Sequence, residues 1–449
     1  MRLTGQELAT ATQGIWHQRH LDDVTFITTD SRHFQQGAVF LALRGDSFDG
    51  HQFAPDAASA LIGDSEGVKA WVGGNIPYLE VSDTLQALGD IAHAWRMKLA
   101  QTTVIGITGS YGKTTVRSML HHLLTGLGLH VHATNANLNN LIGVPQTILA
   151  TPIDADVALI ECGISEQGEM QRLANILSPN GVVMTGMTSA HSEGLGGLDG
   201  VVKEKSRLLS AVKTDGWCAL GNGVADDLKQ QDIDIACQTI QNEVTWKRQG
   251  LQVTFYDQHQ SADLRLALPA DHWCENMALV LSIALATPWN IQISADFQHL
   301  VTILSTWSAV EGRLQTYQGF AGCQILDDAY NANPVSMQAA LHTLQAMPTR
   351  RIAILGDMKE LGNTSLQAHA TLNVQNMDCL WLVGKEMRVL HEQHPISRWF
   401  LNVDALLAWL AANMENIMQG DTVLVKASHS MGLEKVVEML KVKDVDRAL

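Results

Sequence analysis

The segment Gly109-Ser110-Tyr111-Gly112-Lys113-Thr114-Thr115 is the most informative stretch of this chain. It follows a short apolar run at 104–108, which predicts a buried strand, and it precedes apolar residues at helical spacing from Val116 to Leu124. A glycine loop between a strand and a helix presents backbone N–H groups and the positive end of the helix dipole to an anion. The segment therefore predicts a phosphate-binding loop within an α/β sheet.

The loop is a shortened form of the nucleotide-binding pattern, G-x-x-G-K-T. The full pattern has a further glycine five residues before Gly112, where this chain has Ile107. Lys113 is expected to reach the terminal phosphates, and the Thr114 hydroxyl is expected to bind Mg²⁺. The alternative is a glycine turn that opens an ordinary helix, but Lys-Thr-Thr and both flanks favour phosphate. The loop alone indicates nucleotide binding and leaves the reaction open.

Short apolar runs separated by helical patterns continue on both sides of a change in texture near residue 311, and they predict an α/β fold with a mostly parallel central sheet. A strand near the start and a connecting helix at 85–99 complete the pattern. The predicted strands are 39–43, 157–162, 181–185, 217–220, 323–327, 351–355, 379–383 and 422–425.

The chain has 449 residues, enough for roughly two to four domains. We predict three: a mixed α/β substrate domain at 1–97, a P-loop ATPase domain at 98–310, and a C-terminal Rossmann-like α/β domain at 311–449. Apolar residues make up 46% of the chain and charged residues 17%, which excludes a disordered or fibrous protein.

The formal net charge of −16 gives the chain no general attraction to nucleic acid or to an anionic membrane. The N-terminal residues show no basic segment followed by an apolar one, and the apolar run near 277–286 is far shorter than the ~20 residues that span a bilayer. The six cysteines are scattered without a CxxC pair, which favours reduced core cysteines. We expect a cytoplasmic protein, monomeric, without nucleic-acid or membrane partners.

Three further residues follow the loop, and of these Glu161 is a candidate for a metal site by its type and position. Glu161 ends a predicted strand, at the sheet edge where ligands of α/β proteins bind, and a carboxylate there can hold Mg²⁺. His191 follows the next strand, and Lys205 lies on a predicted helix. Taken alone, each also fits an ordinary solvated role.

The order of these features resembles the ATP-dependent Mur ligases of peptidoglycan synthesis, over nearly the whole chain. Longer segments resemble the branch of that family that adds D-alanyl-D-alanine. They are Thr29-Asp30-Ser31-Arg32, Phe40-Leu41-Ala42-Leu43-Arg44-Gly45, Asp49-Gly50-His51, Asn137-Leu138-Asn139-Asn140-Leu141-Ile142-Gly143-Val144-Pro145, Asp327-Asp328-Ala329-Tyr330-Asn331-Ala332-Asn333-Pro334 and Gly356-Asp357-Met358-Lys359-Glu360-Leu361-Gly362.

The resemblance implies a reaction between a UDP-N-acetylmuramoyl-tripeptide, ATP and D-alanyl-D-alanine. The terminal carboxylate of the tripeptide becomes an acyl phosphate, and the amine of the dipeptide then attacks it, which gives the pentapeptide, ADP and phosphate. Such catalysis is mainly positioning and neutralisation of charge.

The resemblance also implies roles for single residues. The loop from Gly109 to Thr115, with Lys113 as a catalytic cation, would hold the phosphates of ATP. Thr114 and Glu161 would hold one Mg²⁺, and His191 would help to hold a second. Lys205 aligns with a lysine that the family carbamylates, which would turn a cation into a metal-binding carboxylate. Asn276 would meet the adenine, and Arg313 would reach the nucleotide through its forked donors.

The implied substrate residues are less sharply marked, because each also suits a turn or a helix cap. Ser31 and Arg32 would face the UDP end of the first substrate, and Asn137 and Asn139 its muramoyl-peptide part. Near D-alanyl-D-alanine or the nucleotide, the resemblance puts Asp328, Tyr330 and Asn331.

Two departures from the family pattern qualify the resemblance. Ala427-Ser428-His429 stands where the family usually has Gly-Ser-Arg, so a permanently charged bidentate donor is lost, and His429 receives no role. The chain also lacks the Asp-Asn-Pro-Arg segment of the sibling ligase that recognises diaminopimelate. A sibling Mur ligase with another amino acid and a non-catalytic P-loop switch protein stay as alternatives, and the third residue of the peptide substrate stays open.

Overall fold

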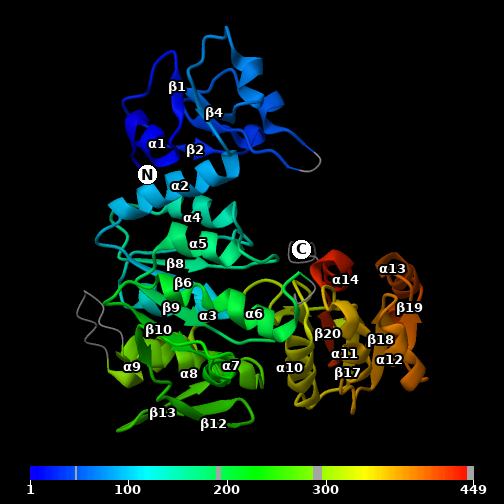
Figure 1. The fold of residues 1–449 in the computed structure, drawn as a ribbon. Helices are drawn as coiled ribbons and strands as arrows, with labels where there is room; N and C mark the ends of the chain where they lie inside the picture. The colour runs from blue at the N-terminus through cyan, green and yellow to red at the C-terminus, as the bar shows by residue number, and fades with distance from the viewer. Residues whose placement is uncertain (46–47, 189–193, 287–295, 442–449) are drawn as a thin grey trace, which may run out of the picture.

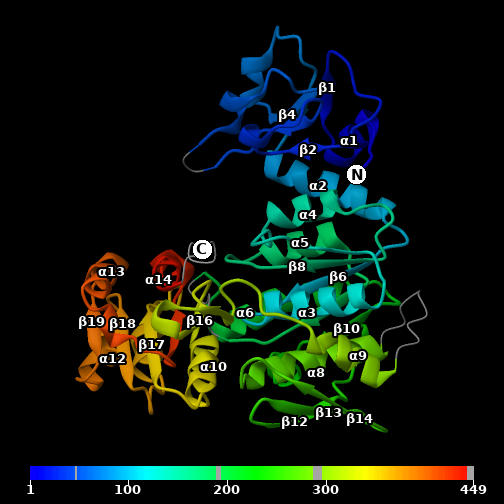
Figure 2. The ribbon, with the colours of Figure 1, turned by 180° about the vertical axis from the view of Figure 1, so that it is seen from behind.

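The structure is a computed structural model, and it describes residues 1–45, 48–188, 194–286 and 296–441. Its strands form four sheets. Figure 1 shows an N-terminal part at the top, a central part below it and a C-terminal part to one side, and Figure 2 shows the same arrangement from behind. Helices and largely parallel sheets alternate along the chain, so the predicted α/β class is confirmed. The predicted boundaries near 98 and 311 stay predictions.

The N-terminal part is built on a five-stranded sheet of order β1-β5-β4-β3-β2, in which β1 is antiparallel to β5 and the other pairs are parallel. Its first helix starts with a capping box between Thr4 and Glu7. The elements are α1 (Gly5–Thr12), β1 (Ile15–His17), β2 (Ile27–Thr28), β3 (Val39–Leu41), β4 (Ala60–Asp64) and β5 (Tyr78–Val81).

Helix α2 (Thr84–Lys98) joins this part to the central one, close to the predicted 85–99. Asp83 caps its start, because the carboxylate accepts from the backbone N–H of Gln86. Near its end the buried Arg96 donates to the carbonyls of Leu177 and Ser178 at the close of α5 (Glu169–Leu177). The guanidinium therefore satisfies helix-end carbonyls and fastens α2 to the central part.

The central sheet has the order β11-β10-β9-β6-β8-β7, and all its pairs are parallel. The chain leaves β6 to one side for β7 and β8, and to the other for β9 to β11. The carboxyl end of β6 is therefore the topological switch point, where α/β sheets bind ligands. The strands are β6 (Thr103–Thr108), β7 (Val131–Ala133), β8 (Val157–Glu161), β9 (Gly181–Met184), β10 (Trp217–Leu220) and β11 (Gln238–Ile240).

Helix α3 (Lys113–Gly126) follows β6 and buries Val116, Met119, Leu120, Leu123 and Leu124, which recur at helical spacing. It packs against α8 (Asp271–Ala286) and α9 (Phe297–Ser305). A separate antiparallel sheet was not predicted; it consists of β12 (Thr245–Gln249), β13 (Gln252–Tyr256) and β14 (Ser261–Arg265). The remaining central helices are α4 (Gly143–Ala150), α6 (Gly197–Ser206) and α7 (Val224–Gln230).

The C-terminal sheet has the order β15-β16-β20-β17-β18-β19, and only β15 runs antiparallel to its neighbour. The strands are β15 (Gln315–Gln318), β16 (Gln324–Asp328), β17 (Arg351–Gly356), β18 (Cys379–Val383), β19 (Arg398–Phe400) and β20 (Thr422–Lys426). The helices are α10 (Pro334–Gln345), α11 (Ser365–Ala370), α12 (Arg388–Gln393), α13 (Val403–Ala411) and α14 (Glu434–Leu440).

The apolar run that includes residues 277–286 lies within α8, where most of its side chains are buried. No helix among the described residues is both long and apolar enough to cross a bilayer. All six cysteines are free thiols, and four of them are buried.

Candidate active site

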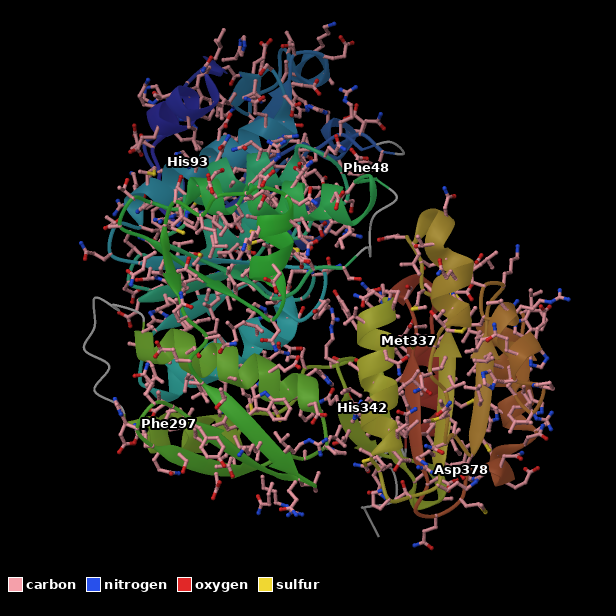
Figure 3. The ribbon with its side chains drawn as sticks, turned by 60° about the horizontal axis from the view of Figure 1, so that its bottom comes forward. Phe48, His93, Phe297, Met337, His342 and Asp378 are labelled. Carbon is pink, nitrogen blue, oxygen red and sulfur yellow. The ribbon has the colours of Figure 1, made fainter. Side chains whose placement is uncertain are left out.

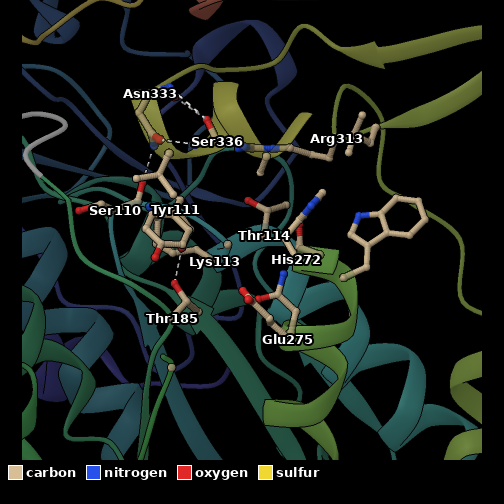
Figure 4. A pocket seen from close by; sticks show the side chains of 18 of the residues that line it. Ser110, Tyr111, Lys113, Thr114, Thr185, His272, Glu275, Arg313, Asn333 and Ser336 are labelled. Carbon is tan, nitrogen blue, oxygen red and sulfur yellow. Dashed lines mark hydrogen bonds between the residues drawn. The ribbon is translucent and has the colours of Figure 1, made fainter. Parts of the chain in front are cut away.

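A cavity of about 290 Å³ lies between the central part and the C-terminal part. Its central wall is made by the phosphate loop and the start of α8, and its other wall by the strand ends and α10 of the C-terminal part. Figure 4 shows side chains from both walls pointing into it. Predicted site residues among its lining are Ser110, Tyr111, Gly112, Lys113, Thr114, Thr115, Asn276, Arg313, Asp328 and Asn331.

The two loop glycines are required by the backbone. Gly109 has φ 147° and Gly112 has φ 79°, both in the region that favours glycine. A Cβ on Gly109 would lie 2.2 Å from Thr185 Oγ1. Gly112 is also the N-cap of α3 and offers no side-chain cap. The first N–H groups of α3 are therefore left for an anion, which is the chemistry of a phosphate cradle.

The loop also carries its own cation. Lys113 Nζ donates to the carbonyl of Gly109 at 2.7 Å, and the Thr185 hydroxyl donates to the carbonyl of Tyr111. The surrounding protein desolvates the ammonium and lowers the pKa of Lys113 to about 8, although Glu161 opposes that shift. A partly buried ammonium beside the free N–H groups at the start of α3 is suited to bind the phosphates of a nucleotide.

Glu161 lies behind the loop rather than in the cavity lining, and its side chain is 1% exposed. Thr114 Oγ1 donates to Glu161 Oε2 at 3.2 Å, and Arg117 Nε donates to Glu161 Oε1 at 2.6 Å. A hydroxyl and a carboxylate side by side are oxygen ligands suited to Mg²⁺. Within the described ranges no three His, Cys, Asp or Glu residues gather as a metal cage, so a magnesium ion here would depend on phosphate oxygens as well.

Lys205 is buried on α6, with 2% of its surface exposed. Burial first, and the nearby charge of Lys113 second, lower the pKa of Lys205 to about 7. Its neighbour Glu204 accepts from the N–H groups of Gly168 and Met170 at the start of α5, which fixes the end of α6 that carries Lys205. His191 lies outside the described residues.

The cavity lining beside α8 contains amides, an imidazole and carboxylates. Asn276 is joined in the lining by Asn222, Asn242 and His272, and by Asp271 and Glu275 of the same helix. Desolvation, reinforced by the charge of Lys426, lowers the pKa of His272 to about 4, so this imidazole is neutral at pH 7. Neutral donors and acceptors suit the edge of a heterocyclic base.

The C-terminal wall contains an arginine with a spare donor. Arg313 Nε is buried and has no hydrogen-bond partner among the described residues. The guanidinium lies 4.3 Å from the ring centre of Tyr330, whose other neighbour is the His429 ring at 5.6 Å. An orphaned donor at a cavity wall is what a phosphate or ribose oxygen would satisfy.

Beside it, two charges neutralise each other. Lys426 Nζ lies 2.7 Å from Asp328 Oδ2 and donates to the carbonyl of Asn331 at 2.8 Å. The pair follows from strand register, because Asp328 of β16 stands opposite Lys426 of β20.

Among the described residues, two polar contacts cross from one wall to the other. Asn333 Nδ2 donates to the carbonyl of Ser110 at 3.4 Å, and His342 Nε2 lies 3.7 Å from Asp271 Oδ2. Figure 3 shows His342 on the side of α10 that faces the central part. The phosphate loop therefore touches the C-terminal part directly.

The other predicted substrate residues lie away from the cavity lining. Ser31 and Arg32 form a 3₁₀ turn in the N-terminal part, where Asp30 caps the turn and pairs with the exposed Arg32. Asn137 is exposed, and the carbonyl of Asn139 accepts from the N–H of Gly163, two residues after Glu161. The structure thus brings Asn139, but not Ser31 or Arg32, close to the metal candidates.

Several cavity or loop partners had no role in the sequence prediction: Arg117, Thr185, His272, Asn333 and Lys426. Asn333 belongs to a segment that was quoted for the resemblance, and Lys426 directly precedes the departing segment Ala427-Ser428-His429. Arg117 follows Thr114 by three residues, nearly one helical turn. That spacing is the one signal that was available for Arg117.

Comparison with known proteins gives family matches along most of the chain. The Mur ligase family catalytic domain matches residues 23–96, the Mur ligase middle domain residues 107–284, and the Mur ligase glutamate ligase domain residues 312–429. A curated Escherichia coli protein, named UDP-N-acetylmuramoyl-tripeptide–D-alanyl-D-alanine ligase, is 32% identical and covers 93% of this chain and 94% of its own. The chain belongs to the Mur ligase family. It is accordingly an ATP-dependent ligase.

Other Mur ligases agree in sequence and in fold. A Bacillus subtilis protein of the same name is 30% identical, with 92% of each chain covered. The crystal structure of MurF from Acinetobacter baumannii superposes with a TM-score of 0.86 at 28% identity over 98% of each chain. MurF ligase from Thermotoga maritima in complex with ADP has a TM-score of 0.79 at 24% identity, over 93% of this chain and 97% of its own, which shows the shared fold.

Proposed function

We propose that this Mur ligase joins D-alanyl-D-alanine to UDP-N-acetylmuramoyl-tripeptide at the expense of ATP. The observation that carries the proposal is full-length similarity of 30% and above to proteins of that name, combined with a phosphate loop and a polar C-terminal wall on one cavity. The product is the UDP-muramoyl-pentapeptide precursor of peptidoglycan.

The reaction consists of two transfers. The terminal carboxylate of the tripeptide attacks the γ-phosphorus, ADP leaves, and an acyl phosphate forms. The amine of D-alanyl-D-alanine then attacks the activated carbonyl, loses a proton, and phosphate leaves. Positioning dominates such chemistry, because the reacting groups are anions that repel each other until cations neutralise them.

The loop and the C-terminal wall supply that neutralisation. Lys113 and the free N–H groups of α3 offset charge on the β- and γ-phosphates, and Arg313 offers its unpartnered donor to the nucleotide. Asn276, which lines the cavity on the first turns of α8, binds the adenine.

Thr114, Glu161, His191 and a carbamylated Lys205 would hold two Mg²⁺ ions, which neutralise phosphate charge when bound. A carbamate forms when a neutral lysine amine attacks carbon dioxide and loses a proton. The burial of Lys205 favours the neutral amine, and the resemblance supplies the precedent. If Lys205→Ala is inactive and short-chain carboxylates restore turnover, the carbamate is supported; full activity of Lys205→Ala would end the idea.

The substrate contacts are divided among three domains, 1–97, 98–310 and 311–449. Ser31 and Arg32 face the UDP end, Asn137 and Asn139 the muramoyl-peptide part, and Asp328, Tyr330 and Asn331 the dipeptide or the nucleotide. Because Ser31 and Arg32 lie outside the cavity lining, the domains must close for these groups to act together. The protein acts as a monomer in the cytoplasm, with no nucleic acid or membrane partner.

Phosphate release with competing amines tests the proposal. With ATP, Mg²⁺ and UDP-N-acetylmuramoyl-tripeptide, D-alanyl-D-alanine should start release, and meso-diaminopimelate should not. The sibling ligase predicts the reverse preference when UDP-N-acetylmuramoyl-dipeptide is supplied. Nucleotide binding without release under any amine would point to the P-loop switch protein instead.

A further inference from the structure

The carboxylate of Glu161 has its two oxygens committed to different partners. Oε1 accepts from Arg117 Nε at 2.6 Å, and Oε2 accepts from the Thr114 hydroxyl at 3.2 Å. Both partners lie on the first turns of α3, three residues apart. Oε2 therefore contacts a residue of the phosphate loop, and Oε1 contacts a residue of α3 beyond that loop.

The main chain at Glu161 is also held on both sides. Its N–H donates to the Thr134 hydroxyl at 2.9 Å, and the N–H of Cys162 donates to the carbonyl of Ile107 at 2.8 Å. With the backbone anchored in the sheet, the freedom left to Glu161 is rotation of its side chain. The Arg117 contact removes that freedom.

Charge gives the same contact a second effect. Glu161 is 1% exposed and Arg117 14% exposed at their side chains, so water does little to stabilise the carboxylate. A buried charge without a partner is costly, and an arginine cannot lose its charge under ordinary conditions. Arg117 therefore supplies the counter-charge of the buried carboxylate and holds it in place before any metal arrives.

We propose that Arg117 is a positioning residue that reserves a single oxygen of Glu161 for Mg²⁺ and disfavours Ca²⁺. Arg117 retains Oε1, so only Oε2 is presented beside Thr114 Oγ1. Mg²⁺ demands near-ideal octahedral geometry and accepts such single oxygens, whereas Ca²⁺ readily takes both oxygens of a carboxylate. The inference rests on the proposed metal role of Thr114 and Glu161.

Metal-dependent binding of a fluorescent ATP analogue tests the inference without turnover. We expect Arg117→Gln to raise the half-saturating Mg²⁺ concentration by about tenfold, the lower end of what loss of a partner behind a metal ligand costs. The half-saturating Ca²⁺ concentration should rise less or fall. The preference of the site for Mg²⁺ over Ca²⁺ should therefore decrease. Arg117→Lys, which keeps the positive charge and can still donate to Oε1, should recover part of the preference.

A matched control separates this effect from general instability. Arg350 pairs with the buried Asp421 at 2.7 Å at the other end of the C-terminal sheet, so Arg350→Gln removes an equivalent pair away from the cavity. The control should keep the wild-type metal preference at a temperature well below each variant's Tm. An Arg117→Gln protein that is folded and binds Mg²⁺ as tightly as wild type, or more tightly, overturns the inference, since Arg117 would then be a placeholder that the metal displaces.

Glu161→Gln distinguishes failure of this inference from failure of the proposed metal site. If Glu161→Gln weakens the Mg²⁺ dependence while Arg117→Gln does not, only the role of Arg117 is wrong. If Glu161→Gln leaves the Mg²⁺ dependence unchanged, the metal role of Glu161 falls, and the role of Arg117 falls with it.

Discussion

Helices α3 and α10 begin at the cavity on opposite walls, and their first turns differ in how the backbone N–H groups are satisfied. Helix α3 starts at Gly112, which offers no side-chain cap. Helix α10 starts at Asn333, whose side chain accepts from the N–H of Ser336 in a capping box, and it has Pro334 in its first turn. The first N–H groups of α3 are open, while those of α10 are satisfied or removed.

The charges follow the same division. The central wall carries Lys113 on an open loop, whereas the C-terminal wall pairs Lys426 with Asp328. On that wall the buried Nε of Arg313 has no hydrogen-bond partner within the part of the chain that the structure describes. The difference indicates that the central wall is built to bind an anion, and that the C-terminal wall is largely self-satisfied and contributes shape and a few directed contacts.

The largest expected effect comes from removing Lys113, the cation of the central wall. Lys113→Ala should lower kcat by about a thousandfold, as loss of a preorganised group that stabilises transition-state charge does. Phosphate release under saturating substrates measures it. Lys69→Ala, at a lysine that pairs with Glu66 on the surface of the N-terminal part, should stay near wild type. Near-normal release by Lys113→Ala would contradict the assignment.

The second-largest expected effect comes from breaking the Lys426–Asp328 ion pair on the C-terminal wall. Lys426→Met should destabilise the protein by about 3 kcal/mol, because it leaves the Asp328 carboxylate buried without its counter-charge. Urea unfolding gives the free energy. The double variant Asp328→Asn/Lys426→Met should regain much of the loss, and a double variant no more stable than the single one would show that the pair is not what matters.

The pH dependence of nucleotide binding tests the role of Lys113 on the central wall. The pKa of Lys113 is about 8 in the free protein, and bound phosphates favour its charged form, so the pKa rises on binding. ATP affinity should therefore be highest below pH 8 and should fall by up to about tenfold per pH unit above it. Titrations of an ATP analogue across this range measure the slope. Lys113→Arg should show a flat profile, and an equal slope in that variant would assign the titration to another group.

The smallest effect concerns the cap of α10. Asn333→Ala should cost about 1 kcal/mol of stability, the usual value for a lost N-cap, and it removes the contact to Ser110. Thermal unfolding measures the loss of stability. The Kd for ATP should rise only slightly. A large loss of ATP binding would mean that α10 shares the anion site, against the division drawn above.

Much of the fold was predictable because the buried strands of parallel sheets have short apolar sequences. Trp217–Leu220 and Cys379–Val383 match their predictions, and β16 is displaced by one residue because Asp328 still pairs with Lys426. The sheet at 245–265 was missed, although its residues alternate between buried and exposed, because the strands are polar on one face and lack an apolar run.

The phosphate loop was predictable because its spacing is local. Arg117 and Lys426 were not assigned, since their partners Glu161 and Asp328 lie far along the chain and meet them only through strand order and register. The same holds for the separation of Ser31 and Arg32 from the cavity, which depends on how α2 joins the N-terminal part to the central one.

The transfer of labelled oxygen tests the central claim most directly. UDP-N-acetylmuramoyl-tripeptide with heavy oxygen in its terminal carboxylate is turned over with ATP and D-alanyl-D-alanine, and the released phosphate is analysed by mass spectrometry. If the carboxylate attacks the γ-phosphorus in the cavity between the two walls, one heavy oxygen appears in each phosphate. Phosphate released without the label would contradict the account.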